Sequence, residues 1–158
     1  MTKRFNIRVY GLLIDENDRI LVSDECIRGN FYTKFPGGGM EQGEGTIECI
    51  VREFREETGL KITVDSHFYT TDFFQISFFN REEQIISIYY KVSAVELNNL
   101  PVKTRQFDFD LPQLEDQNDQ KEAMRWIRID ELSEQDVSLP IDKIVVKMLL
   151  NEYQESRK

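Results

Sequence analysis

Three glutamates, Glu53, Glu56 and Glu57, have a spacing that would gather their carboxylates on one side of a helix. At about 100° per residue, these positions fall within an arc of roughly 100°. The arrangement is unfavourable by itself, because like charges repel and the last turns of a helix disfavour anions. A divalent cation would remove the conflict, since Mg²⁺ and Mn²⁺ prefer oxygen ligands. The spacing therefore favours a metal site over the alternative, a solvated acidic face.

The segment 46–58 that carries these glutamates has the pattern of an amphipathic helix. Four apolar residues recur at three- and four-residue spacing and predict one buried face: Ile47, Ile50, Val51 and Phe54. Thr46 is the expected N-cap. Gly59 stands where a left-handed residue commonly ends a helix. Cys49 lies on the carboxylate side, where we expect it to be a small filler rather than a ligand, because a thiol binds Mg²⁺ poorly.

Three consecutive glycines, Gly37 to Gly39, precede the helix and predict a tight turn with an exposed backbone. Glycine allows positive φ and a close approach of the main chain to a ligand. A glycine run alone is usually only a turn. Joined to the acidic helix, it predicts the loop half of a loop–helix site. We expect Glu44 and Arg52 to brace this loop through a charge-assisted hydrogen bond rather than to do chemistry.

Residues 38–60 together resemble the signature of the Nudix hydrolases. The signature is a glycine, five residues, a glutamate, seven residues, and then Arg-Glu-apolar-any-Glu-Glu-any-Gly-apolar. Every position is filled here: Gly38, Glu44, Arg52, Glu53, Phe54, Glu56, Glu57, Gly59 and Leu60. Such a match arises by chance on the order of once in 10^9 starting positions. Gly38, Glu44, Arg52 and Gly59 would have structural roles in it.

The resemblance implies a divalent-metal hydrolase that cleaves a nucleoside diphosphate linked to another group. Carried over by position, Glu53, Glu56 and Glu57 hold the metal, and the carbonyl of Gly37 can also reach it. Glu56 and Glu53 are the catalytic candidates, with Glu56 sharing metal and water duties. Mg²⁺ is the expected cofactor and Mn²⁺ the alternative. Which carboxylate is the general base stays open, because family members differ.

Some family members use a further carboxylate outside the signature. Glu122 is our candidate for this additional metal ligand, because it precedes a predicted strand near Trp126, and Glu115 is the second choice. The alternative is that Glu122 is a solvated surface acid.

Aromatic residues supply the candidates for substrate binding. Phe107 and Phe109 lie on a long polar segment, 98–121, which predicts a lid or a binding loop. A second aromatic group consists of Phe73, Phe74, Phe78 and Phe79. These rings could stack on a nucleotide base, but the preferred interpretation is that they lie in the core of a strand. His67, the single histidine, is expected to be packed or exposed rather than catalytic.

The substrate is less defined than the chemistry. Relatives that cleave coenzyme A, ADP-ribose or dinucleoside polyphosphates have further sequence features near the signature of residues 38–60, here called the box. These features are not visible in this chain, which favours a nucleoside triphosphate or a nucleotide sugar as the substrate. The alternative function is a non-catalytic Nudix-like module that senses a nucleotide or a sugar. Such modules tend to lose box glutamates, whereas this chain keeps all of them.

Composition limits the partners. With a net charge of −9 over 158 residues, the chain lacks the positive charge that nonspecific binding to a nucleic acid polymer needs. A small nucleotide-type substrate remains compatible, since a cation can bridge acidic protein and anionic phosphate. Only two cysteines occur, Cys26 and Cys49, so no disulfide framework is indicated. No signal peptide or membrane span is apparent, and we expect a cytoplasmic protein that does not associate with membranes.

The remaining pattern predicts a single domain over residues 1–158. The expected strands cover 5–14, 19–23, 61–72, 73–79, 84–97 and 126–129. A final helix at about 140–156 opens on Pro140 and should dock on the sheet or serve a homodimer interface. The fold class is therefore α/β, and the resemblance implies a Nudix-like α/β/α sandwich with a mixed β-sheet.

Overall fold

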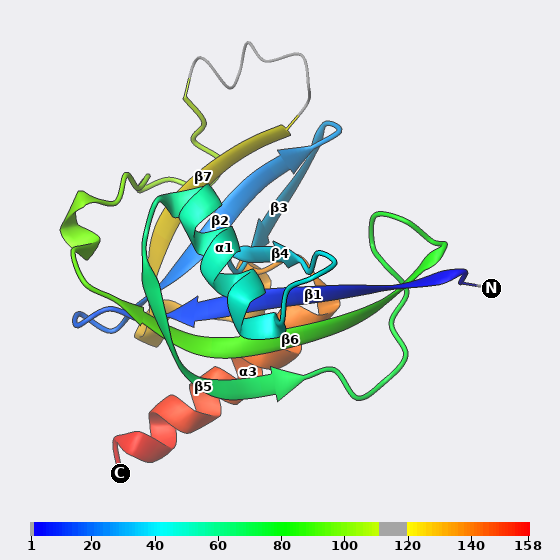
Figure 1. Cartoon of the computed structure of the whole chain (residues 1–158). Helices are drawn as coiled ribbons and strands as arrows, with labels where there is room; N and C mark the ends of the chain where they lie inside the picture. Colours follow the sequence, from blue (N-terminus) through cyan, green and yellow to red (C-terminus); the bar gives the residue numbers. More distant parts are fainter. Residues whose placement is uncertain (1, 111–119) are drawn as a thin grey trace. The chain divides into compact units, whose positions relative to one another are not determined.

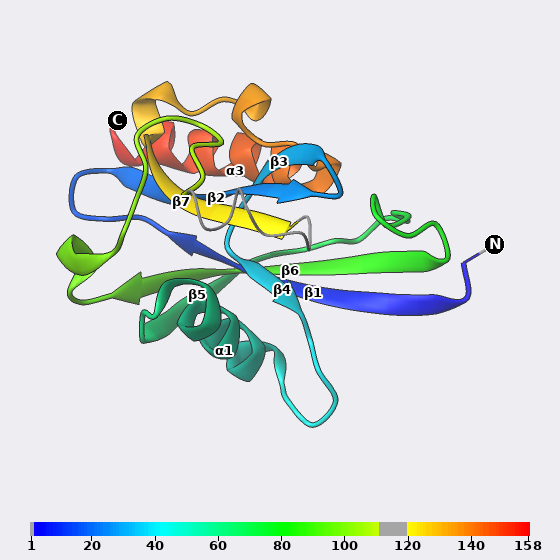
Figure 2. The same cartoon turned by 90° about the horizontal axis from the view of Figure 1, so that it is seen from above.

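The computed structural model describes residues 2–110 and 120–158 (Figures 1 and 2). Contacts between residues group the chain into two compact units. The first unit consists of Met1–Leu13 and Pro36–Leu100, and the second of Ile14–Phe35 and Pro101–Lys158. Within the described residues, each unit contains a β-sheet and an α-helix.

The first unit contains a mixed sheet with the strand order β4-β1-β6-β5. The strands are β1 (Arg4–Leu13), β4 (Gly37–Gly39), β5 (Ile62–Thr70) and β6 (Glu83–Ala94). β1 runs parallel to β6 and antiparallel to β4, and β5 is antiparallel to β6. The predicted α/β class with a mixed sheet is confirmed.

β5 is an edge strand whose pairing with β6 is irregular. Its register shifts between Val64 and Ser66 and again between His67 and Tyr69. Each shift leaves an extra residue in β5, which bends the strand locally and increases its twist.

Helix α1 (Thr46–Thr58) lies against one face of this sheet, as Figure 2 shows. Its buried side chains are Cys49, Ile50 and Phe54. Gly11 in β1 makes the close approach possible, because a Cβ at this position would overlap the ring of Phe54. The helix that carries the acidic residues is thus held directly on the strand by an aromatic side chain.

The helix has the predicted bounds, but two details differ. The N-cap is Gly45, not Thr46, and the hydroxyl of Thr46 instead shares a hydrogen bond of 2.6 Å with the Tyr90 hydroxyl. Ile47, expected on the buried face, is 52 % exposed, whereas Cys49 is fully buried. The apolar face is therefore rotated toward the carboxylate side, because Phe54 and Cys49 set the contact with the sheet.

The second unit contains an antiparallel sheet with the order β3-β2-β7. Its strands are β2 (Arg19–Ile27), β3 (Asn30–Lys34) and β7 (Gln120–Arg128). Helix α3 (Pro140–Ser156) begins at Pro140, as predicted, and buries four aliphatic side chains: Ile141, Val145, Val146 and Leu149.

Both cysteines of the chain, Cys26 and Cys49, are buried thiols.

Several strand predictions were wrong in extent. β2 and β7 are longer than expected, because the two strands pair with each other over their whole length, through the polar residues Asp24–Glu25 and Lys121–Glu122. Segment 73–79 is not a strand; it has a single bridge, from Ile76 to Gln84. The Ser77 hydroxyl accepts hydrogen bonds from the amides of Phe79 and Asn80, which commits this backbone to a turn.

The four phenylalanines of that segment are consequently outside the core. Phe73, Phe74, Phe78 and Phe79 are between 41 % and 64 % exposed. The preferred interpretation as strand-core residues was therefore wrong.

In the ranges that the structure describes, no helix combines the length and the apolar content that crossing a membrane requires.

Candidate active site

The glycine segment before α1 is the short strand β4 at the edge of the first unit's sheet, not the tight turn expected from the sequence. It pairs with β1 so that Gly37, Gly38 and Gly39 lie opposite Tyr10, Val9 and Arg8. Gly37 has φ 148°, and a Cβ there would collide with the Val9 carbonyl. Glycine at this position is therefore required by both conformation and space.

At Gly38 the side-chain space is occupied by a carboxylate. A Cβ on Gly38 would lie 2.5 Å from Oε1 of Glu53 and 2.7 Å from its Oε2. Glu53 thus rests directly against the backbone of β4. A side chain at position 38 would push this carboxylate away.

Glu57 reaches the same strand from the next turn of the helix. Its Oε2 accepts a hydrogen bond of 3.2 Å from the amide of Gly37. Glu53 and Glu57 therefore converge on adjacent residues of β4. This convergence agrees with the helical spacing on which the predicted metal site rested.

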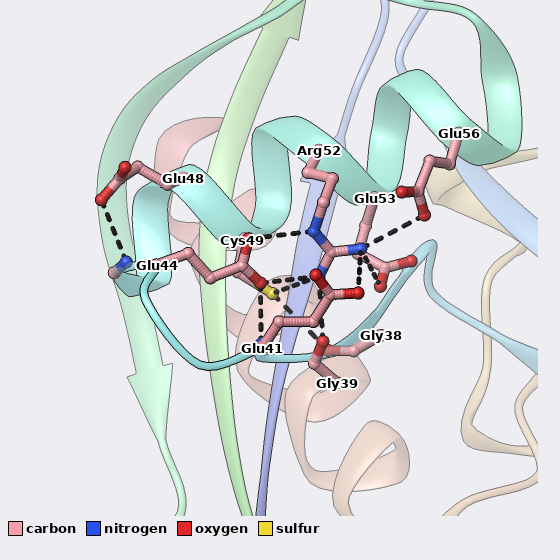
Figure 3. Close-up of polar contacts among 10 residues, drawn as sticks. Gly38, Gly39, Glu41, Glu44, Glu48, Cys49, Arg52, Glu53 and Glu56 are labelled. Atoms are coloured by element: carbon pink, nitrogen blue, oxygen red, sulfur yellow. Dashed lines mark hydrogen bonds and ion pairs between the residues drawn. The ribbon is translucent and has the colours of Figure 1, made fainter.

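Arg52 connects the acidic residues of the helix with the glycine strand (Figure 3). Its Nη1 donates to Oε1 of Glu53 at 3.0 Å and to Oε2 of Glu56 at 3.2 Å. Its Nη2 donates to the carbonyl of Gly39 at 3.0 Å. Nε and Nη2 also form a bidentate pair with Glu44, at 2.9 and 2.6 Å. The predicted brace between Glu44 and Arg52 is present, and Arg52 additionally holds two carboxylates of the cluster.

The contacts of this network shift the pKa values of Glu44, Arg52 and Cys49. The hydrogen bonds from Arg52, followed by that from the Glu41 amide, lower the pKa of Glu44 to about 2. The bond to Glu44 in turn raises the pKa of Arg52 above its already high value. Burial, reinforced by the charge of Glu44, raises the pKa of Cys49 to about 12. The thiol is thus protonated at neutral pH, which fits the prediction that it is filler rather than a ligand.

The helix terminus that positions these residues is formed by Gly59. Its φ of 75° and ψ of −2° are left-handed, and its amide donates to the Arg55 carbonyl at 3.0 Å. This is the helix end predicted from the sequence, and it places Glu56 and Glu57 in the final turn.

The donor set suits a hard divalent cation, although the carboxylates do not form a closed cage. Within the described residues, no group of three or more acidic, histidine or cysteine side chains has the arrangement of a preformed metal site. Glu53 and Glu56 instead share one cationic nitrogen of Arg52, while Glu57 contacts Gly37. The shared guanidinium offsets the repulsion between the neighbouring carboxylates of Glu53 and Glu56, and Glu57 has a different partner. Because Glu53 and Glu56 already converge on one positive centre, oxygen ligands for Mg²⁺ or Mn²⁺ are at hand.

The additional carboxylate predicted from the sequence belongs to the second unit. Glu122 is half-buried in β7, where it lies opposite Glu25 of β2. Its assignment as a metal ligand stays a prediction. Glu115, the second choice, lies outside the described residues.

Phe107 and Phe109 also belong to the second unit, where they form an aromatic group with Phe31. The Phe107 and Phe31 rings are 5.1 Å apart, and Phe109 stacks on Phe31 at 6.4 Å. Phe109 is only 7 % exposed and packs with Cys26 and Ala123. Phe109 therefore contributes to the core, and a role of either ring in substrate binding stays a prediction.

Sequence reasoning missed a buried ion pair in the second unit. The fully buried carboxylate of Asp24 accepts hydrogen bonds from Arg125, at 2.8 and 3.0 Å, and from Thr33, at 2.8 Å. A buried charge of this kind needs such partners. The signal was hidden because the predicted strand began at Trp126 and so excluded Arg125.

Comparisons with known proteins point to the same family that the sequence pattern resembles. The family model described as NUDIX domain matches residues 4–148. An uncharacterised Nudix hydrolase of Bacillus subtilis (strain 168), YvcI, is 38% identical over 55 residues, which is 35% of this chain and 34% of that protein. An 8-oxo-dGTP diphosphatase of Escherichia coli (strain K12) is 35% identical over 60 residues, 37% of this chain and 46% of that protein. The matched stretches thus span less than half of either relative.

Solved structures extend the likeness to the whole fold. A NUDIX hydrolase from Nitrosomonas europaea superposes with a TM-score of 0.64 at 20% identity, covering 98% of this chain and 91% of that one. At this level of identity the likeness concerns the fold alone. It agrees with the α/β fold and mixed sheet predicted from the sequence.

Proposed function

This chain belongs to the Nudix hydrolase family, and we propose that it is a divalent-metal-dependent hydrolase that cleaves the diphosphate linkage of a nucleoside diphosphate joined to another group. The observation that carries the proposal is the meeting of α1 with β4. Glu57 bonds to the Gly37 amide and Glu53 occupies the space beside Gly38. Both carboxylates thus border a strand that has no side chains of its own.

In the proposed mechanism, Glu53, Glu56, Glu57 and the Gly37 carbonyl hold Mg²⁺ or Mn²⁺. The bound ion would neutralise phosphate charge and lower the pKa of a water molecule. Glu56 is 58% exposed, whereas Glu53 is 13% exposed. The accessible carboxylate of Glu56 is therefore best suited to receive the proton of the attacking water. Glu53 would act mainly as a ligand.

Arg52 positions the ligands rather than touching the substrate. It donates to the Gly39 carbonyl and to Glu44, which fixes the guanidinium relative to both β4 and the helix. From there its Nη1 orients Glu53 and Glu56. Ligands held in place before binding lower the cost of assembling a metal site.

The favoured substrate is a nucleoside triphosphate, and a nucleotide sugar is the second candidate. The similarity to a protein described as an 8-oxo-dGTP diphosphatase supports the first, although it covers only 37% of this chain. With a net charge of −9, a bound cation can bridge the acidic protein and such an anionic substrate.

A panel of nucleotides in the presence of Mg²⁺ tests the proposal. Phosphate, pyrophosphate and nucleoside monophosphate release would be measured for nucleoside triphosphates and nucleotide sugars. We expect turnover by the wild type and a loss of at least about a hundredfold in Glu57→Gln, because the removed ligand contributes several kcal/mol to transition-state stabilisation. Glu48→Gln is the matched control, since Glu48 lies on the same helix and bonds to Gly45, away from the cluster.

Nucleotide binding without turnover in either protein would contradict the proposal. That result would support the sensing module instead. Equal turnover in the wild type and Glu57→Gln would also contradict it, because the catalytic centre would then lie elsewhere.

A further inference from the structure

The segment 103–110, here called the strap, is held against the three-stranded sheet of the second unit. It is attached at its first residue, where the amide of Lys103 donates to the carbonyl of Met124 in β7 at 2.8 Å. Lys103 also forms a parallel bridge with the same strand. Farther along, the strap contacts the sheet through its side chains.

The middle of the strap is hydrogen-bonded to the buried carboxylate of Asp24 and its partners. Nε2 of Gln106 donates to the Thr33 hydroxyl at 2.9 Å, and that hydroxyl donates to Oδ1 of Asp24 at 2.8 Å. The amide of Phe107 donates to Oδ2 of Asp24 at 3.4 Å. Asp24 is also paired with Arg125 of β7, at 2.8 and 3.0 Å. The strap therefore contacts an ion pair that the strands of the sheet already form among themselves.

Two features make the closed position of the strap costly. Phe107 has φ 57°, a left-handed conformation that is unfavourable for a bulky side chain. Asp24 is 0% exposed, and burial of an ion pair carries a desolvation cost that its partners must offset. If the strap lifts, Phe107 regains an ordinary backbone conformation and water reaches Asp24. Arg125 and Thr33 remain beside Asp24, because both belong to strands of the sheet.

Little apolar surface opposes this opening. Phe109 is the one buried residue of segment 103–110, all of which the structure describes, and it packs with Cys26 and Ala123. Phe107 is half-buried and leans on this cluster. Segments with few buried apolar contacts open at a lower free energy than the core strands beneath them. The strap thus combines weak attachment with the two costs of closure.

From this balance we propose that the strap opens locally while the sheet β3-β2-β7 stays folded, and that its hydrogen bonds to Thr33 and Asp24 hold it closed. Opening uncovers the thiol of Cys26, which is 3% exposed in the closed position. Phe107 and Phe109, the two candidates for substrate binding, belong to the strap and move with it. The inference is independent of the proposed function, because neither metal nor substrate takes part in the opening.

Labelling of Cys26 with iodoacetamide measures the opening in the full chain. The rate is followed by peptide mass spectrometry at constant pH, at urea concentrations below the unfolding transition and with reagent dilute enough for the rate to be proportional to it. The urea dependence of the opening free energy then reports how much surface the opening exposes. We expect a slope below about a third of the m value for unfolding, measured by circular dichroism. Labelling that occurs only with the full m value would overturn the inference, because Cys26 would then react only in the unfolded chain.

Substitutions at Gln106 test the hydrogen bonds that close the strap. Gln106→Ala removes the bond to Thr33 and leaves the buried ion pair intact, so labelling of Cys26 should accelerate about fivefold with the same small slope. Gln106→Glu should accelerate it further, because the Thr33 hydroxyl already donates to Asp24 and has no second proton to donate.

Arg105→Gln is the matched control, since the Arg105 side chain is 84% exposed and its ion pair with Asp108 spans 3.8 Å at the surface. Its labelling rate should stay within about twofold of the wild type. Equal rates in Gln106→Ala and Arg105→Gln would overturn the inference, because the bond to Thr33 would then have no part in closure.

Discussion

A single side chain, Arg52, holds Glu53 and Glu56, two of the three acidic residues of the helix cluster. One guanidinium bonds to Glu44, to the Gly39 carbonyl, and to both Glu53 and Glu56. Five N–H groups in a rigid plane make this possible, whereas lysine has one nitrogen and no fork. Besides bracing the segment between Gly39 and Glu44, Arg52 therefore links this segment to the carboxylates of Glu53 and Glu56.

Gly38→Ala tests whether the space beside β4 belongs to the Glu53 carboxylate. A Cβ at position 38 would come within 2.5 Å of Oε1 of Glu53, so the carboxylate must move. We expect Mn²⁺ affinity to fall by about tenfold or more, as when the support of a metal ligand is lost. Gly39→Ala is the control, because its nearest contacts are 3.6 and 3.7 Å away and it should keep Mn²⁺ affinity. Unchanged affinity in Gly38→Ala would contradict Glu53 as a ligand.

Glu44→Gln tests the pH dependence that the Arg52 pair gives to stability. The pKa of Glu44 is lowered from 4.5 to about 2 in the folded chain. A depressed carboxyl pKa stabilises the fold fully above pH 4.5, and this contribution is lost as the pH falls toward 2. Between these values the free energy of unfolding should fall less steeply in Glu44→Gln than in the wild type, as measured by urea unfolding at each pH. Glu16→Gln, at an exposed turn, should follow the wild type; if Glu44→Gln does so too, the pair contributes nothing to this dependence.

At the scale of elements, the helix was predictable because its signals are local. The glutamate spacing, the apolar recurrence and Gly59 each act within a few residues, and the helix has the predicted bounds. Its N-cap was missed, because Glu48 bonds to the Gly45 amide and Thr46 is taken by Tyr90, a residue distant in sequence. That Glu53, Glu56 and Glu57 lie on one side of α1 likewise follows from the helical repeat. The hydrogen-bond partner of each carboxylate could not be predicted, because it depends on where β4 lies in the fold.

The strands were predicted less well, since their extent depends on pairing. Gly37 to Gly39 form a strand only because β1 supplies its ladder partners. Conversely, the aromatic segment 73–79 has strand-like composition, but hydrogen bonds to Ser77 turn its backbone. Composition alone does not reveal which partner a backbone will find.

Substitutions at Gly59 test the left-handed end of α1. With φ at 75° and nothing within 4 Å of a Cβ, the effect of a side chain there is conformational only. We expect Gly59→Ala to lower the free energy of unfolding by about 1–2 kcal/mol. Gly59→Asn should lose less, because asparagine tolerates this conformation better. Chemical denaturation gives both values, and an alanine variant as stable as the asparagine variant would contradict the assigned geometry.

At the scale of the molecule, charge links metal binding to stability. The chain carries a net charge of −9, and the proposed metal ligands add local repulsion. An ion that binds only the folded state stabilises it by mass action, by about 2.7 kcal/mol at a hundred times Kd.

The melting temperature should therefore rise with Mn²⁺. For a chain of this size the expected shift is roughly 5–10 °C at a hundred times Kd, measured by calorimetry or differential scanning fluorimetry. Sodium chloride at equal ionic strength controls for screening of the net charge. Glu57→Gln should lose most of the shift; a variant that keeps it would show that Mn²⁺ binds outside the proposed ligands.

The two register shifts in β5 have a consequence for how concentrated protein behaves. An exposed edge strand with a regular register can pair with a strand of a neighbouring molecule and start aggregation. Here the register shifts before Ser66 and before Tyr69 interrupt the hydrogen-bond ladder that such a strand would need. The strand at the opposite edge, β4, is only three residues long. The four-stranded sheet thus ends on both sides in backbone that is poorly suited to growth into fibrils.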